Sequence, residues 1–540
     1  MIFASQTFLF GFLPLFFILY LAAGKFFGLR GKNTVLFFMS LIFYAWGEPV
    51  YIVLMIYSSV LDYVCGRMIY SADRQGKNGK KKAFLCVSMV GNLALLGVFK
   101  YLGFFTQTVN SVFHLSIPVF SLALPVGISF YTFQTMSYSL DVYRGTITPQ
   151  KNFIYFGAYV AMFPQLIAGP VVRYSDIARE LDCRTENLNG FASGARKLIC
   201  GLAKKVLIAN TMAAVADPLF ENPASSLGVL GTWIAIIAYT FQIFFDFSGY
   251  SDMAIGMGRM MGFNYPENFN YPYISRSVTE FWRRWHITMS TFFRDYVYIP
   301  LGGSRCSVIK WLRNVFIVWF LTGLWHGAAW HYVAWGLYFG VLLVVEKFLL
   351  RKLLEKSHVI SHIYAMLMII CGWVIFRCDS VSDALSFIGS MFGASGLYGN
   401  DTVPSPVLLQ QSGVSTVFFV TLIFAVLFSA PIIPWLKNKL ESSCTKLALR
   451  GFRTHSASRA LVRSARARLI QSVYILRFLI PHQLHRQSAL PRSALHFGNP
   501  VRRFAEDKDG AHSPGEQNLR RGCADRGLYF RSVRLRSKWR

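Results

Sequence analysis

Apolar runs recur along residues 1–440, at lengths close to the roughly 20 residues that a helix needs to cross a bilayer. Hydrophobic residues make up 54% of the chain, and one water-soluble core cannot bury that much apolar surface. The runs begin near residues 7, 34, 50, 83, 117, 152, 198, 229, 311, 331, 359 and 415. Gly and Pro interrupt several of them, so we expect about ten or eleven crossings together with re-entrant and interfacial helices. The sequence therefore predicts an all-α polytopic membrane protein.

Basic segments between the runs indicate an orientation. Residues 30–32 and 67–82 are rich in Lys and Arg, and such loops remain on the cytoplasmic side of a membrane. Residues 347–356 form a third basic loop. The first run has no basic segment before it and no small-residue cleavage site after it. We therefore expect it to be the first membrane helix, with the N-terminus outside.

Several segments are too polar to face lipid although they lie among apolar residues. Residues 124–134 contain Pro and Gly and end at Gln134, which suggests a broken or re-entrant helix. Residues 241–252 place Asp246 and Asp252 in an apolar stretch. Ionisable groups at membrane depth are costly and often functional. The alternative for each carboxylate is a hydrogen bond to backbone at a helix end, or a pair with an arginine.

Residues 281–295 combine aromatic residues near helical spacing with several arginines. This pattern predicts one amphipathic helix at the membrane interface, with Trp at the headgroup level and Arg reaching outward. Arg283 and Arg284 are explained by that arrangement. His286 is not, because an interfacial helix does not need an imidazole.

A second histidine, His326, lies in the apolar run 319–331 and is flanked by Trp325 and Gly327. An imidazole among membrane helices is often a hydrogen-bonded core residue. We expect His326 to be functional instead, because the following glycine removes a side chain and would let a substrate approach closely.

Five segments together resemble the membrane-bound O-acyltransferase family. Residues 281–286 (FWRRWH), 298–303 (YIPLGG) and 321–327 (LTGLWHG) resemble motifs of the family as a whole. Residues 44–49 (YAWGEP) and 246–256 (DFSGYSDMAIG) resemble its bacterial alginate O-acetyltransferase branch. That branch is related to the D-alanyl transferase of teichoic acid modification. The resemblance covers residues 1 to about 435, with the five motifs in the family's order.

The resemblance implies a ring of transmembrane helices around a central channel. An acyl donor is engaged on the cytoplasmic side, and a hydroxyl on the far side receives the acyl group. The family's catalytic histidine falls on His326 and its second polar position on His286. In this branch an extracytoplasmic acetyltransferase of the SGNH type often completes the transfer, so such a partner is expected.

These residue types suit acyl transfer. An alcohol is a weak nucleophile at neutral pH, and imidazole is the side chain suited to remove its proton. We expect His326 to be the general base, or a transient acyl relay, with His286 orienting the donor or passing a proton. Further candidates for binding substrate or lining the channel are Trp325, Asp246, Asp252, Gln134, Arg283 and Arg284. The two arginines would attract an anionic donor if they are not interfacial anchors.

The expected reaction moves an acetyl group from a thioester, either acetyl-coenzyme A or an acyl carrier, toward hydroxyls of a secreted or cell-surface polysaccharide. The thioester is a substrate, and no bound cofactor is expected. No metal is expected either, because the chain has no HExxH or CxxC motif. The expected partners are membrane lipid, the polysaccharide and the donor's carrier, without nucleic acid, at the cytoplasmic membrane. The alternatives are transfer of D-alanyl or another acyl group to a cell-wall polymer, a polytopic transporter, and an inactive assembly subunit.

The last hundred residues have a different composition. Residues 441–540 contain 21 Lys and Arg against 6 Asp and Glu, and 18 of the 21 are Arg. They show no helical or strand period. Three interpretations are open: a tail that binds anionic lipid, a tail that binds nucleic acid, or an out-of-frame translation of a normal C-terminus. The Arg bias favours the third, which predicts a disordered tail over residues 441–540. The family resemblance implies a membrane-bound O-acyltransferase domain over residues 1–440.

Overall fold

The computed structural model describes residues 2–120, 122–167, 169–397, 399, 409–432, 434–436 and 438–439. Helices dominate this part of the chain, and no strand occurs in it. The predicted tail, residues 441–540, lies outside the described residues. Eight described helical segments are long and apolar enough to cross a membrane: Thr7–Ala45, Ile52–Arg74, Asn78–Phe113, Leu188–Phe220, Ala224–Met260, Val308–His326, Trp330–Leu354 and His358–Arg377. The chain is therefore a multi-pass membrane protein.

The number of crossings expected from the sequence, ten or eleven, is not confirmed. The runs that begin near residues 7 and 34 belong to one element, which continues from a π-helical turn into α1 (Leu13–Ala45) and kinks at Gly28, where φ is 58°. Residues 30–32, which we expected in a loop, lie within this helix. Other expected spans form elements too short to cross: α5 (Ile128–Tyr143), α6 (Phe153–Ala161), α7 (Phe163–Leu166) and α20 (Thr416–Ser429).

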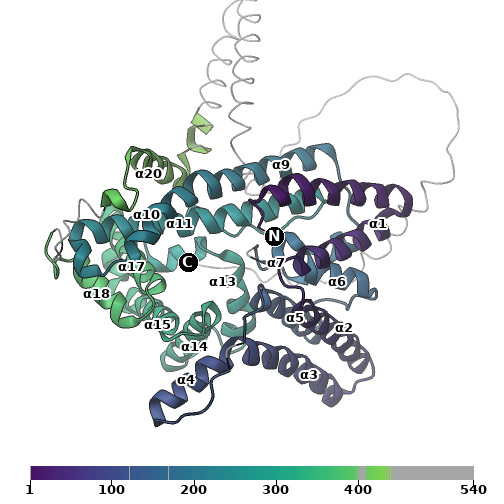
Figure 1. Ribbon diagram of the computed structural model, residues 1–540. Coiled ribbons are helices and arrows are strands. Elements are labelled where there is room, and N and C mark those ends of the chain that lie inside the picture. The colour runs from purple at the N-terminus through teal and green to yellow at the C-terminus, as the bar shows by residue number, and fades with distance from the viewer. Residues whose placement is uncertain are drawn as a thin grey trace, which may run out of the picture. The chain divides into compact units, whose positions relative to one another are not determined.

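Further α-helices form much of the rest of the described chain. They are α2 (Ile52–Arg74), α3 (Asn78–Leu96), α4 (Leu102–Phe113), α8 (Tyr174–Asp182), α9 (Leu188–Ala203), α10 (Asn210–Phe220), α11 (Ala224–Met260), α12 (Val278–Arg284), α13 (Ile287–Phe293), α14 (Val308–His326), α15 (Trp330–Val345), α16 (Arg351–Leu354), α17 (His358–Arg377) and α18 (Val381–Met391). Figure 1 shows α2, α3 and α5 side by side, α9 beside α11, and α14 beside α15; these pairs are in contact.

A buried carboxylate joins α2, α3 and α5. Asp62 accepts hydrogen bonds from the hydroxyl of Ser139 and the amide of Asn92, each at 2.6 Å, and also from the hydroxyl of Ser88. Each of the three helices supplies at least one of these groups, so the polar side chains inside the bundle satisfy one another. This contact fixes α5, whose N-terminal end reaches the cavity described below.

Glycines let α9 and α11 approach closely. A Cβ atom built on Gly201 of α9 would lie 2.4 Å from the carbonyl oxygen of Gly249 on α11. Gly194 and Gly256 meet in the same way, with a distance of 2.5 Å from the first to the carbonyl of the second. In each helix the two glycines are seven residues apart and thus share a face. Small residues at such positions are typical of packed membrane helices.

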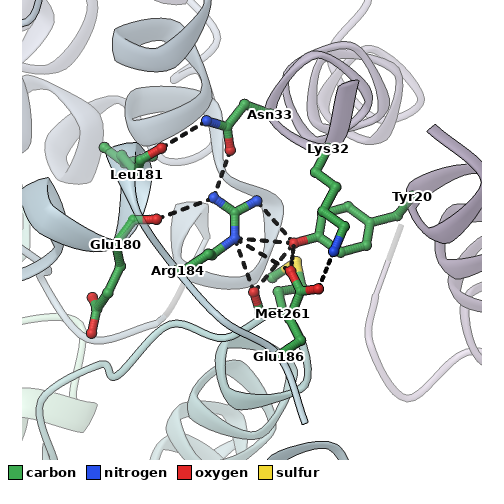
Figure 2. Close-up of polar contacts among 8 residues, drawn as sticks. All are labelled: Tyr20, Lys32, Asn33, Glu180, Leu181, Arg184, Glu186 and Met261. Atoms are coloured by element: carbon green, nitrogen blue, oxygen red, sulfur yellow. Dashed lines mark hydrogen bonds and ion pairs between the residues drawn. The ribbon is translucent and has the colours of Figure 1, made fainter. Parts of the chain in front are cut away.

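A polar network around Arg184 ties α1 to the segment that follows α8 (Figure 2). The guanidinium, which is fully buried, donates to the hydroxyl of Tyr20 at 2.8 Å, to the side-chain oxygen of Asn33 at 2.6 Å and to the carbonyl of Met261 at 3.0 Å. Glu186 supplies the nearby negative charge and accepts the Tyr20 hydroxyl at 2.8 Å. Because a buried cation is tolerated only when paired and hydrogen-bonded, we interpret this cluster as structural.

Candidate active site

A cavity of about 510 Å³ lies where several distant segments meet. The segment before α5, the α12–α13 turn, the end of α14 and parts of α11, α15 and α17 line it. Its lining includes the polar side chains of Lys100, Ser129, Asp246, Tyr250, His286 and His326, and most of the other lining residues are aromatic or aliphatic. Concave apolar sites with a few convergent polar groups are the usual form of binding and catalytic sites.

His326 is the last residue of α14, which ends where Gly327 becomes extended. Its ring packs edge to face on Trp325 and Trp335, each at 4.9 Å between centroids, and on Phe376 at 5.3 Å. Within the described part of the chain neither ring nitrogen has a hydrogen-bond partner, although the ring lines the cavity. The aromatic rings therefore hold the imidazole in place and leave its nitrogens available to a substrate.

The glycine next to this histidine has a different role from the one we expected. A Cβ atom on Gly327 would lie 2.1 Å from the ring of Tyr332, so that ring fills the space we had assigned to a substrate. Gly327 allows the close turn between α14 and α15. Access to His326 comes instead from the cavity.

His286 lies at a break in the helix. We predicted one amphipathic helix over residues 281–295, but α12 ends at Arg284 and α13 begins at Ile287. Between them His286 has φ 44°, a left-handed conformation that is uncommon for a residue other than glycine. Such strained positions gather at functional sites. The break turns the imidazole into the interior, where 1% of the residue is exposed.

Asn268 fixes the protonation of His286. Its side-chain oxygen accepts the backbone N–H of Thr288 at 3.3 Å and the Thr288 hydroxyl at 2.9 Å, and the same oxygen lies 3.0 Å from Nδ1 of His286. A backbone N–H can only donate, so the amide oxygen must face it, and Nδ1 of His286 must then carry the proton. Nε2 keeps its lone pair, and it is buried without a partner among the described residues. Burial lowers the pKa of His286 to about 3, so the ring is neutral near pH 7.

The rings of His286 and His326 both lie near the indole of Trp325. The indole centroid lies 6.0 Å from the ring of His286 and 4.9 Å from that of His326. Trp325 itself lines the cavity. Three of the sequence-derived candidates thus come together although they are separated by 40 residues of chain.

The two predicted carboxylates of α11 have different surroundings. Asp246 lines the cavity and pairs with Lys205 at 2.7 Å. Asp252 does not line it, and is buried between Lys197 at 3.0 Å and Lys204 at 2.6 Å. The alternative to a functional role was a backbone hydrogen bond or an arginine partner, and in both cases the partner is a lysine. We interpret Asp252 as part of a structural ion pair.

The remaining candidates lie away from the cavity. Gln134 is buried in α5, and its side-chain amide has no hydrogen-bond partner in the described residues. Arg283 is exposed, while Arg284 pairs with Glu280 at 2.8 Å and donates to the carbonyl of Asn270. Both arginines therefore have the surroundings of anchoring residues rather than of cavity residues.

Sequence reasoning missed Lys100, Ser129 and Asn268. A lysine in an otherwise apolar run was a signal that could have singled out Lys100. Nothing in the sequence pattern marked the other two. In the described chain no group of three or more His, Cys, Asp or Glu side chains is arranged to hold a metal ion.

Comparison with known proteins identifies the class that this fold and cavity represent. The model of the membrane-bound O-acyltransferase family matches residues 148–378. The chain is 43% identical to a probable alginate O-acetylase AlgI of Pseudomonas syringae pv. tomato, over 74% of this chain and 76% of the relative. It is 42% identical to the probable alginate O-acetylase AlgI of Pseudomonas aeruginosa, over 73% and 75%. It is 33% identical to a peptidoglycan O-acetyltransferase of Helicobacter pylori, over 74% and 81%.

The chain belongs to the membrane-bound O-acyltransferase family, in its bacterial alginate O-acetyltransferase branch. It is accordingly an acyltransferase, as the motifs around His286 and His326 predicted. The matched segment, residues 148–378, contains both histidines, together with Asn268 and Trp325.

Proposed function

We propose that the protein moves an acetyl group from a thioester donor on the cytoplasmic side of the cytoplasmic membrane toward hydroxyls of a secreted or cell-surface polysaccharide. The observation that carries the proposal is the cavity into which His326 presents its imidazole, with His286 beside it. Neither nitrogen of the His326 ring is hydrogen-bonded to any residue that the structure describes. Two relatives are named as an alginate O-acetylase and a peptidoglycan O-acetyltransferase, and these names support a polysaccharide acceptor.

In the proposed step His326 is the general base. It takes the proton of the attacking hydroxyl while the oxygen forms a bond to the thioester carbonyl carbon. The tetrahedral intermediate then expels the thiolate, which recovers a proton from the imidazolium, so that His326 is neutral again. Positioned general-base catalysis contributes about 10²–10⁴-fold. His286, with a lone pair on Nε2, accepts a hydrogen bond from the donor or from the acceptor and orients it.

The donor is proposed to be acetyl-coenzyme A or an acyl carrier, and the acceptor stage to involve an extracytoplasmic acetyltransferase of the SGNH type. Asp246, at the cavity and paired with Lys205, is proposed to contact the substrate during passage. A transporter would need a pathway but no general base. The requirement for His326 therefore separates the two classes.

The test measures polymer-bound O-acetyl in cells that carry the intact chain or His326→Ala. His358→Ala is the matched control, because His358 is exposed at the start of α17 and outside the cavity. Loss of acetyl in His326→Ala only, with equal amounts of protein in the membrane, is the expected result. Acetylation that survives His326→Ala would overturn the assignment. Bound D-alanine in place of acetyl would change the acyl group and keep the mechanism.

A further inference from the structure

Lys100 lies at the cavity in an unusual stretch of helix. Residues Gly97–Tyr101 form a π-helical turn between α3 and α4. Such turns occur mostly as single insertions, and frequently at functional sites. The turn belongs to the candidate membrane span Asn78–Phe113, and the side chain of Lys100 reaches the cavity wall.

Two adjacent residues of this turn contact the end of α14. The ammonium of Lys100 donates to the carbonyl oxygen of Trp325, and the hydroxyl of Tyr101 donates to that of Leu324 at 2.8 Å. Carbonyls in the last turn of a helix lack partners within the helix. Lys100 and Tyr101 therefore both cap α14 just before His326. Capping alone is a structural role.

Capping does not account for the charge of Lys100. Tyr101 shows that a neutral hydroxyl is sufficient to satisfy one of these carbonyls. Among the described residues no carboxylate pairs with Lys100, and its other hydrogen bond goes to the hydroxyl of Ser129 at 3.1 Å. Lys100 is partly buried. A cation at membrane depth without a counterion is costly, and intramembrane charges of this kind are by default functional.

One N–H group of the Lys100 ammonium is not used by its hydrogen bonds to the described residues. The ammonium carries three N–H groups, of which the described contacts use two. The lysine lines the same cavity as His326 and is held by the carbonyl of the residue next to it. A group that supplies positive charge is therefore fixed beside the group that supplies the base.

We propose that Lys100 is a third catalytic residue, whose free N–H donates to the carbonyl oxygen of the acyl group and stabilises the oxyanion formed on attack. This inference rests on the proposed function. As the hydroxyl oxygen bonds to the carbonyl carbon, its proton goes to His326 and the carbonyl electron pair moves to the oxygen facing Lys100. When the carbonyl forms again, the C–S bond breaks and the thiolate takes the proton from His326. Lys100 remains protonated throughout.

Three variants separate the catalytic role from the capping role. Lys100→Met removes both the charge and the cap, while Lys100→Gln removes the charge and keeps a neutral N–H donor. Tyr101→Phe is the matched control, because it removes the neighbouring cap on Leu324 without changing any charge. All are made in the full chain. The rate of polymer acetylation per membrane-inserted protein is measured in cells, which supply their own donor, and the melting temperature is measured in detergent.

Removal of one oxyanion donor typically lowers the catalytic rate by about 10²–10³-fold. We expect losses of that size in Lys100→Met and Lys100→Gln and a loss below about tenfold in Tyr101→Phe, with similar melting temperatures in Lys100→Gln and Tyr101→Phe. Equal losses in Lys100→Gln and Tyr101→Phe would overturn the inference, since capping would then explain both. If the unsubstituted full-length chain transfers no more acetyl than His326→Ala does, that result would instead refute the proposed function itself.

Discussion

The side-chain oxygen of Asn268 lies 3.0 Å from Nδ1 of His286 and decides which nitrogen of that ring carries the proton. Thr288 supplies two further donors to the same oxygen. The side-chain amide of Asn268 therefore cannot exchange its oxygen and nitrogen positions without losing both of these hydrogen bonds. The histidine therefore presents an acceptor at Nε2. Asn268 acts on the reaction through His286, as a positioning residue.

Replacement of Asn268 by Leu should lower acetylation by about 10- to 100-fold, because loss of a group that orients a functional imidazole has effects of that order. Polymer-bound acetyl per inserted protein is the measurement. Ser251→Ala is the control: it removes the hydroxyl that the Asn268 amide N–H₂ donates to at 3.2 Å and leaves the oxygen in place. Equal activity in the two variants would contradict the positioning role.

The low pKa of His286 predicts a pH dependence of stability. The folded protein keeps this ring neutral down to a pKa of about 3, while an unfolded histidine binds a proton below about pH 6.5. Between these values only the unfolded state is protonated, so the group's contribution to stability falls as pH falls, by about 1.4 kcal/mol per pH unit.

Melting temperatures of the wild type and His286→Gln, measured from pH 7 to pH 5, test this expectation. Gln cannot titrate, so the melting temperature of His286→Gln should fall less steeply with falling pH than that of the wild type. This holds whatever stability the substitution costs at pH 7. At pH 5 the change in the free-energy difference between the two proteins, relative to pH 7, should reach about 2 kcal/mol. Parallel curves would mean that the pKa of His286 is not lowered in the folded protein.

The sequence was sufficient for the helical membrane fold because a bilayer requires long apolar helices, and composition reveals those directly. It was sufficient for His286 and His326 because both lie in distinctive motifs. It could not reveal the break at His286, where the left-handed residue contacts Asn268, 18 residues away. A helical pattern of aromatic residues continues across the break and hides it.

Contacts between residues that are distant in the chain could not be predicted from the sequence either. Asp252 was recognised as an intramembrane carboxylate, but its lysine partners come from α9 and the π-helical turn after it. Lys100 meets the end of α14 across 225 residues. Such pairs follow from the packing of helices, which a single sequence does not encode in any local pattern.

The two carboxylates of α11 should respond differently to the loss of charge. Asp252→Asn leaves Lys197, which is fully buried, with a weakened set of partners, and breaking a buried pair costs about 3–5 kcal/mol. Asp246 is 44% exposed, so its pair with Lys205 adds little stability, about 0–1 kcal/mol. We expect Asp252→Asn to lower the melting temperature and the amount of folded protein.

Asp246→Asn should instead leave stability nearly unchanged and reduce acetylation per folded protein, because Asp246 lines the cavity. The two measurements, melting temperature and polymer-bound acetyl, are made on both variants. If Asp252→Asn melts like the wild type, the buried network does not stabilise the fold. If Asp246→Asn is fully active, its carboxylate has no part in the passage of substrate.

The contact between α9 and α11 depends on the absence of side chains at its glycine pairs. Gly201→Ala would place a methyl group 2.4 Å from the carbonyl oxygen of Gly249, and backbone must move to accept it. Overpacking of this kind costs about 1–3 kcal/mol, more than the roughly 1 kcal/mol that alanine gains over glycine in a helix. Gly79→Ala is the control, because Gly79 lies in the first turn of α3 with nothing within 4 Å of its Cβ position. The melting temperature should fall for Gly201→Ala and stay level or rise for Gly79→Ala. If both variants melt alike, α9 can shift away from α11 at little cost, and the ion pairs between these helices would then have to hold them together.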